Sequence, residues 1–463
     1  MSSAYKDSMK KSFLRLFLFL IIIYSCSKKD TAPASKEFKI SGKVVDTLGL
    51  GLSNIQIFYQ KDSFIVTDAN GFWYKNITLG STVIQPKDTN YIFSPSSVKV
   101  INSDTNIVFN ARPVSQRDIN ALHVYNWFTH MQLSNGLLES TENSNIISLY
   151  DNALAALVFI AKSDYTRAEL VFNFFNSRLN SELLTGTGGF FQFRDKNGVP
   201  NGNRWLGDNA WLLIALNNYQ AKTNNYQYQN LITALSNWIQ QQQDTDGGVW
   251  GGFDNSSVRI GKVTEGMIDA FNAVSGYTNF HQNLLNYLKL NRWNSNEKLL
   301  MSWPGNKYVY ALDNHSWGYC AFEDFPYSVL QKAAIFVNTQ IATVSNKSIT
   351  GYCFDIDKDN VWLEGTGQMV VALQKANQIN IAAYYLSEME KVIITSNSFS
   401  SSLGMPYSSN NGTHYGTSAL WVGADTKPCI SSSAWYLFGC LNFDPMAISY
   451  LKTIPINNKF WLN

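Results

Sequence analysis

Five acidic side chains with a regular spacing are the residues best suited to chemistry. Asp151, Asp208, Glu265, Asp313 and Glu364 follow one another at intervals of 48 to 57 residues, each at or next to the start of a segment typical of a buried helix. A protonated carboxyl group can act as a general acid, and an ionised one as a general base. Capping of helix N-termini is the alternative explanation, and it suits the aspartates better because Glu is a poorer cap.

Tryptophans flank these acidic helix starts. They are Trp205, Trp211, Trp317, Trp362 and Trp435. An aromatic ring can stack on the C–H face of a sugar, and packing between helices is the alternative explanation for each ring. Aromatic residues make up 14% of the chain and charged residues 15%, a balance that favours a carbohydrate-handling protein. A net charge of +2 disfavours nucleic acid as a partner, because no surplus of basic residues is present to neutralise phosphates.

We predict that Glu364 is one catalytic carboxyl group and that either Asp208 or Glu265 is the other. Asp151 and Asp313 are expected to position sugar hydroxyls. The rest of the predicted substrate-binding set consists of His315, Trp211, Trp317, Trp362 and Trp435.

No cofactor or metal is expected. The stretch 355–360 opens like a calcium-binding loop, but its sixth residue is Asn360 rather than Gly. Its twelfth residue is Thr366 rather than a bidentate Glu, so an Asp-rich turn is predicted there.

The apolar pattern from residue 118 onward has the 3.6-residue period of helices. Segments with a polar face are predicted at 118–132, 165–180, 225–242, 280–292, 326–341 and 380–395. They alternate with segments that are apolar on all sides, at 150–161, 208–220, 265–275, 315–322, 364–376 and 432–441. Six outer and six inner helices in strict alternation predict an (α/α)6 barrel. The second and fifth inner helices would then face each other, which favours Asp208 as the partner of Glu364.

This alternation, the glycine-aromatic segments such as 188–193 and 247–253, and the acidic helix starts resemble the six-hairpin glycosidase superfamily over about residues 118–445. The string Gly207-Asp208-Asn209-Ala210-Trp211 is similar to a helix start of bacterial α-1,6-mannanases. Those enzymes carry two adjacent aspartates, and Gly207 stands here in place of the first. The superfamily also contains polysaccharide lyases and sugar epimerases, so the resemblance does not settle the reaction. We predict hydrolysis of an oligo- or polysaccharide without a cofactor, and with inversion because facing helix starts can supply the carboxyl separation of roughly 6.5–9.5 Å that inverting enzymes use.

Two other functions stay open at this point. A lyase acting on a uronic-acid glycan would need a cation near the substrate carboxylate, and Arg194, Arg204 and Arg259 lie near the loops of the expected functional face. The second alternative is a lipoprotein that binds glycans without catalysis.

The segment 36–112 alternates apolar and polar residues with the period of strands. Its six or seven short strands predict a small antiparallel β-sandwich, with a hairpin at Asn70-Gly71. The runs 40–46 and 67–72 resemble the carboxypeptidase regulatory-like domain, which implies a spacer or accessory role. Residues 113–463 form the helical domain of this two-domain organisation.

The N-terminus is typical of an export signal. Lys10 and Lys11 precede an apolar stretch that ends before Cys26, and Ile23-Tyr24-Ser25-Cys26 resembles a bacterial lipoprotein cleavage site. We therefore predict a signal peptide at 1–25, lipidation of Cys26, a tether at 26–35 and anchoring to a bacterial membrane, with the outer membrane favoured. The alternative is an uncut membrane anchor. We expect a monomer, with the four remaining cysteines as buried free thiols.

Overall fold

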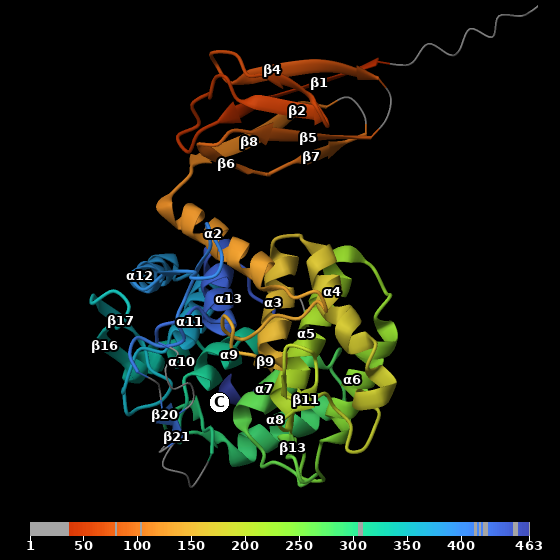
Figure 1. Ribbon diagram of the computed structural model, residues 1–463, viewed down its shortest axis with the longest axis vertical. Coiled ribbons are helices and arrows are strands. Elements are labelled where there is room, and N and C mark those ends of the chain that lie inside the picture. The colour runs from red at the N-terminus through yellow and green to blue at the C-terminus, as the bar shows by residue number, and fades with distance from the viewer. Residues whose placement is uncertain are drawn as a thin grey trace, which may run out of the picture. The chain divides into compact units, whose positions relative to one another are not determined.

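The computed structural model describes residues 37–78, 81–101, 104–303, 309–411, 414–415, 418–419, 425–447 and 452–462. The chain forms two compact units, and the division falls between Ser115 and Gln116 (Figure 1). The predicted signal, Cys26 and the tether lie outside the described residues. Within the described part, no helix has both the length and the apolar character needed to cross a membrane.

The N-terminal unit consists of two four-stranded sheets with strand orders β4-β1-β8-β6 and β3-β2-β5-β7. A single apolar core takes side chains from both sheets, among them Ile40, Ile57, Ile84 and Phe109, none of which is exposed. The strands are β1 (Glu37–Val45), β2 (Gln56–Gln60), β3 (Ser63–Val66), β4 (Phe72–Thr78), β5 (Thr82–Lys87), β6 (Tyr91–Ser94), β7 (Val98–Val100) and β8 (Asp104–Pro113).

Two details of the predicted sandwich are wrong. The pairing is not purely antiparallel, because β1 and β8 run parallel. Asn70-Gly71 does not close a hairpin either, since β3 pairs with β2 whereas β4 pairs with β1. The local turn is as expected, with Gly71 at φ +79° and Asp68 Oδ1 accepting two backbone N–H groups. The strands on either side of this turn, β3 and β4, belong to different sheets. Gly71 C=O accepts the N–H of Val44 in β1, and this bond directs β4 into the sheet of β1.

The helical unit is built on a closed ring of six helices, called the inner ring below. They are α3 (Leu149–Ala161), α5 (Leu206–Thr223), α7 (Thr264–Ala273), α9 (Asp313–Ala321), α11 (Leu363–Lys375) and α13 (Ile430–Leu441). Each helix packs against the next in this order, and α13 packs against α3 to close the ring. Helices α3 and α5 are buried along almost their whole length, as their apolar sequences predict.

A second helix packs on the outside of each ring member. The outer helices are α2 (Gln116–Met131), α4 (Tyr165–Asn176), α6 (Gln229–Gln241), α8 (Asn279–Asn291), α10 (Ser328–Lys332) and α12 (Ile379–Glu390). They pack on α13, α3, α5, α7, α9 and α11 respectively. Helix α6 buries only Leu231, Leu235, Trp238 and Ile239, which lie on one face at helical spacing.

The predicted outer helix at 326–341 is wrong over most of its length. Only α10 is helical, a 3-10 turn η2 (Ala333–Phe336) follows, and β16 (Val337–Ile341) pairs with β17 (Ser348–Tyr352). The run Val337-Asn338-Thr339-Gln340-Ile341 contains three β-branched residues and alternates partly buried with exposed positions, which suits a strand.

Short pieces connect the helices. They are β9 (Ile147–Ser148), π-helix η1 (Leu179–Leu183), β10 (Phe193–Arg194), β11 (Pro200–Asn201), β12 (Arg204–Trp205), β13 (Gly252–Phe253), β14 (Trp293–Asn294), β15 (Leu299–Leu300), β18 (Ile394–Thr395), β19 (Leu403–Gly404), β20 (His414–Tyr415), β21 (Ser418–Ala419), η3 (Ile456–Asn458) and η4 (Phe460–Leu462). Cys320, Cys353 and Cys429 are buried free thiols, whereas Cys440 is free but half-buried.

Candidate active site

A cavity of about 270 Å³ lies at the starts of the inner-ring helices. Its lining combines carboxyl groups, aromatic rings and small polar side chains. The lining residues are Ser148, Tyr150, Asp151, Gln192, Phe193, Trp205, Gly207, Asp208, Trp211, Glu265, Asp269, Asp313, Trp317, Phe354, Trp362, Glu364, Tyr407 and Ser431.

All five predicted carboxyl groups line this cavity, together with a sixth, Asp269. They come from α3, α5, α7, α9 and α11, with Glu265 and Asp269 both on α7. Glu265 is half-buried and the other five are buried. The fold therefore concentrates acidic groups from five helices in one small, largely desolvated space.

Capping does not explain most of these carboxyl groups. The residues that precede α3, α5, α7, α9 and α11 are Ser148, Trp205, Val263, Leu312 and Trp362. Ser148 Oγ itself caps the backbone N–H of Asp151, at 3.3 Å. Asp313 is the exception, because its Oδ1 accepts the backbone N–H of Asn314 at 2.7 Å.

Glu364 is the carboxyl group with the most hydrogen-bond donors. The hydroxyl of Tyr150 donates to its Oε1 at 2.7 Å, and Gln368 Nε2 donates to the same oxygen at 3.3 Å. The indole N–H of Trp435 donates in turn to the Tyr150 hydroxyl, at 3.1 Å. Burial raises the pKa of Glu364 to about 7, while the donors Tyr150, Ser431 and Gln368 oppose that rise by favouring the carboxylate.

The carboxyl group of Asp208 has few hydrogen-bond donors around it. Its Oδ2 is buried and accepts no hydrogen bond. Burial and the charge of Asp151 raise the pKa of Asp208 well above its usual value, against a smaller opposing effect of Gln192. A raised pKa favours the protonated form, which suits a general acid.

Asp269 occupies the space that a side chain at position 207 would need. A Cβ added to Gly207 would lie 3.0 Å from Asp269 Oδ2. Asp269 is fully buried and neither oxygen accepts a well-formed hydrogen bond, although the Trp211 indole faces it. Burial and the charges of Asp313 and Asp208 raise its pKa well above the usual value. Gly207 thus leaves room for a carboxyl group from α7 beside Asp208.

Glu265 and Asp313, on neighbouring helices, lie close enough for each carboxyl group to perturb the pKa of the other. Burial is the main cause that raises the pKa of Asp313 to about 7. Burial followed by the charge of Asp313 raises the pKa of Glu265 well above its usual value. Two adjacent carboxyl groups cannot both ionise easily, so this pair holds a proton at neutral pH.

Among the described lining residues there is no Arg, Lys or His. The three arginines considered for a uronate site are used elsewhere. Arg194 forms an ion pair with Glu182, Arg204 donates to the carbonyl groups of Gly188 and Gly189, and the guanidinium of Arg259 lies over the Trp250 and Phe253 rings.

Only some of the predicted substrate-binding residues line the cavity. Trp211, Trp317 and Trp362 line it, whereas Trp435 packs against Trp211 and Trp317 with ring centroids 5.8 and 6.4 Å away. His315 is not part of the lining. It is buried, its Nδ1 lies 3.0 Å from the Ala311 carbonyl oxygen and its ring packs on Phe336. Burial lowers the pKa of His315 to about 4, so it is neutral.

Sequence reasoning missed several lining residues. Asp269 follows Glu265 by four positions on α7, so helical spacing was a usable signal for it. Tyr150 directly precedes Asp151, yet only the fold shows its bond to Glu364. Phe354 and Tyr407 come from connecting segments, where no periodicity marks their direction.

No protein-family model and no curated protein matches the sequence. Among solved structures, a glycosidase variant covers 73% of this chain and all of its own, at 10% identity and a TM-score of 0.51. An α-amylase from Clostridium perfringens covers 72% of this chain and all of its own, at 7% identity and a TM-score of 0.50. A family 76 glycoside hydrolase from a bovine Bacteroides thetaiotaomicron strain covers 88% of this chain and 96% of its own, at 11% identity and 0.43. At such identities the first two likenesses concern the fold alone.

Proposed function

We propose that the helical unit is an (α/α)6-barrel glycoside hydrolase that acts on a neutral oligo- or polysaccharide with inversion. The observation that carries the proposal is the convergence of six carboxyl groups from five helices on one aromatic-walled cavity. Hydrolysis of a glycosidic bond needs one protonated and one ionised carboxyl group. The aromatic rings offer faces on which sugar rings can stack.

In this proposal Asp208 is the general acid and Glu364 the general base. Asp208 protonates the leaving glycosidic oxygen, while Glu364 takes a proton from the water that attacks the anomeric carbon from the opposite face. The donors around Glu364 favour its carboxylate, and the undonated Oδ2 of Asp208 favours its acid form. In the inner ring α5 is three helices from α11 in either direction, so the two groups line the cavity from opposite members of the ring.

Glu265 is the less favoured partner for Glu364. Its carboxyl group interacts with that of Asp313, and two such neighbours favour a singly protonated pair. We assign Glu265, Asp313, Asp151 and Asp269 to the recognition of sugar hydroxyls, for which a carboxyl group is a strong acceptor.

A uronate lyase is a weaker explanation of the same cavity. Such an enzyme must neutralise the carboxylate of its substrate, and the described lining residues offer six acidic groups and no cation for that purpose. The candidate arginines bind other groups, and His315 lies outside the lining.

The purified protein should be tested on a panel of neutral and uronic-acid glycans, with reducing ends and ultraviolet absorbance read together. New reducing ends without absorbance of unsaturated uronates are the expected result. Absorbing products would replace the proposal by the lyase, and binding without turnover would replace it by a glycan-binding lipoprotein.

We further propose that the protein is exported and anchored through a lipid on Cys26, with the β unit as a spacer. The basic residues, apolar stretch and cysteine at its N-terminus support this proposal. Fractionation of cells that produce the wild type and Cys26→Ser tests it. Only the wild type should sediment with membranes, and membrane association of both would favour an uncut anchor.

A further inference from the structure

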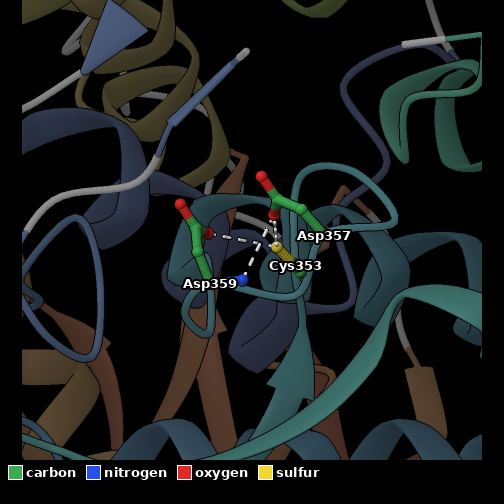
Figure 2. A group of neighbouring side chains, drawn as sticks. All are labelled: Cys353, Asp357 and Asp359. Carbon is green, nitrogen blue, oxygen red and sulfur yellow. Dashed lines mark hydrogen bonds between the residues drawn. The ribbon is translucent and has the colours of Figure 1, made fainter. Parts of the chain in front are cut away.

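A second group of acidic side chains lies on the segment 353–360, which connects β17 to α11. Figure 2 shows the carboxyl groups of Asp357 and Asp359 beside the sulfur of Cys353. One potential ligand atom from each of these three residues lies within 4.8 Å of the other two. The thiol donates to Asp357 Oδ1 at 3.8 Å and to Asp359 Oδ1 at 3.5 Å.

Two buried side chains of the same loop have polar atoms without a hydrogen-bond partner, although Asp355 Oδ1 accepts the backbone N–H of Asp357 at 3.2 Å. Asp355 is fully buried, its carboxyl group lies within hydrogen-bonding reach of the Asp357 carboxyl group, and its Oδ2 accepts no hydrogen bond. Asn360 is also fully buried, and neither its Oδ1 nor its Nδ2 has a partner. Leaving a buried polar group unsatisfied destabilises the fold, so these atoms favour a further ligand at the loop.

The charge of the loop points to the sign of that ligand. Asp355 and Asp357 bring two carboxyl groups into contact, and in the described part of the chain neither forms an ion pair with a basic side chain. A cation between them would remove the repulsion and fill the empty acceptor sites. Water could satisfy Asn360, but unlike a cation it would not stabilise the ionised forms of two adjacent carboxyl groups.

We propose that the loop binds a calcium ion through the carboxylates of Asp355, Asp357 and Asp359 and the amide oxygen of Asn360. Calcium accepts six to eight oxygen ligands in flexible geometry, whereas magnesium demands a near-ideal octahedron. Zinc would use Cys353 as a thiolate. Cys353 Sγ lies within hydrogen-bonding distance of both carboxylates, so as a neutral thiol it can donate to an oxygen ligand, and we assign the ion to the oxygen ligands.

The sequence disfavoured calcium because Asn360 stands where a twelve-residue calcium-binding loop has glycine. In the structure the left-handed turn is made by Lys358, at φ +57°, so position 360 needs no glycine. The loop is a shorter oxygen-rich turn with its own geometry.

The proposed ion would hold the wall of the cavity without touching substrate. Phe354 lines the cavity from within the loop, and its C=O accepts the N–H of Leu312 at 2.9 Å. Two residues beyond the loop, Trp362 leads into α11 and also lines the cavity. The site lies outside the catalytic groups, so the inference does not depend on the reaction proposed above.

Isothermal titration of the chelator-treated protein with CaCl₂, MgCl₂ and ZnCl₂ tests the proposal, together with thermal unfolding. One calcium ion should bind per chain and raise the melting temperature by several degrees. The variants Asp357→Asn and Asp355→Asn should each weaken calcium binding, on the order of 10-fold or more, by analogy with other metal sites.

Asp254→Asn is the matched control, because Asp254 Oδ1 caps a similar turn by accepting the N–H groups of Ser256 and Val258. It should bind calcium like the wild type. Asp357 is exposed, so its variant should fold even if the buried Asp355→Asn does not. Absence of calcium binding, equal binding by Asp357→Asn, or tight zinc binding that Cys353→Ser abolishes would each overturn the proposal.

Discussion

The cavity and the loop 353–360 both gather carboxyl groups, but they draw them from the chain in opposite ways. The cavity combines groups from five helices, and its Tyr150–Glu364 hydrogen bond joins residues 214 positions apart. The loop takes Asp355, Asp357 and Asp359 from five consecutive residues. Rigid helix starts hold buried carboxyl groups close together, where they retain protons. A loop leaves Asp357 exposed and can adjust its oxygens around an ion.

The largest effect should come from the two proposed catalytic groups. Glu364→Gln and Asp208→Asn should each lower kcat on the order of 10²–10⁴-fold, because each removes a proton-transfer group. Kinetics on the glycan identified in the panel measure this, with circular dichroism as the check of folding. Glu297→Gln, at an exposed glutamate, is the matched control. Near-full turnover of Glu364→Gln would show that its assignment is wrong.

A steric change at the cavity wall should have the next largest effect. An added Cβ at Gly365 would overlap the Trp362 ring and come within 2.7 Å of the Leu312 side chain. We expect Gly365→Ala to lower the free energy of unfolding by about 1–3 kcal/mol and to raise KM, because the ring must move. Gly261→Ala, which meets no atom within 4 Å, should be neutral. Unchanged unfolding of Gly365→Ala in denaturant would contradict this packing.

The cavity should also make stability depend on pH. The pKa values of Asp151, Asp313 and Glu364 are each raised to about 7 in the folded state, from 3.8 for the aspartates and 4.5 for the glutamate. Their protonated forms stabilise the fold below about pH 4, and this contribution is lost as pH rises through 7. The melting temperature should therefore fall between pH 5 and pH 8.

Asp269→Asn tests whether the cavity causes that fall. It removes a buried acidic group whose raised pKa acts in the same direction, so its melting temperature should change less with pH than that of the wild type. Thermal unfolding at pH 5, 6, 7 and 8 measures the slope. Parallel slopes for the two proteins would place the titrating groups elsewhere.

The smallest effect on turnover should come from the loop. Asp357→Asn in the presence of calcium should lower the melting temperature by a few degrees and leave kcat within about twofold, because the ion contacts no reacting atom. Kinetics and unfolding of the same preparation measure both. A loss of kcat as large as that of Glu364→Gln would give the loop a direct part in the reaction.

The sequence predicts the acidic cavity better than it predicts the loop, for a physical reason. A helix start follows from apolar periodicity, and all five carboxyl groups chosen by their place at such starts line the cavity. His315 shares that place but points to Phe336, because periodicity near a helix end does not fix the direction of a side chain. The burial of Asp355 and Asn360 follows from tertiary packing, which no local pattern reports.

The closure of the inner ring also determines when the cavity can form during synthesis of the chain. Trp435 of α13 donates to Tyr150 of α3 across 285 positions, so the hydrogen-bond chain to Glu364 cannot exist until the polypeptide has been synthesised at least as far as residue 435. Such long-range closure slows folding, because the entropy of joining distant segments must be overcome first. If the chain is exported across a membrane, as we propose, its acidic cavity cannot form until α13 has crossed that membrane.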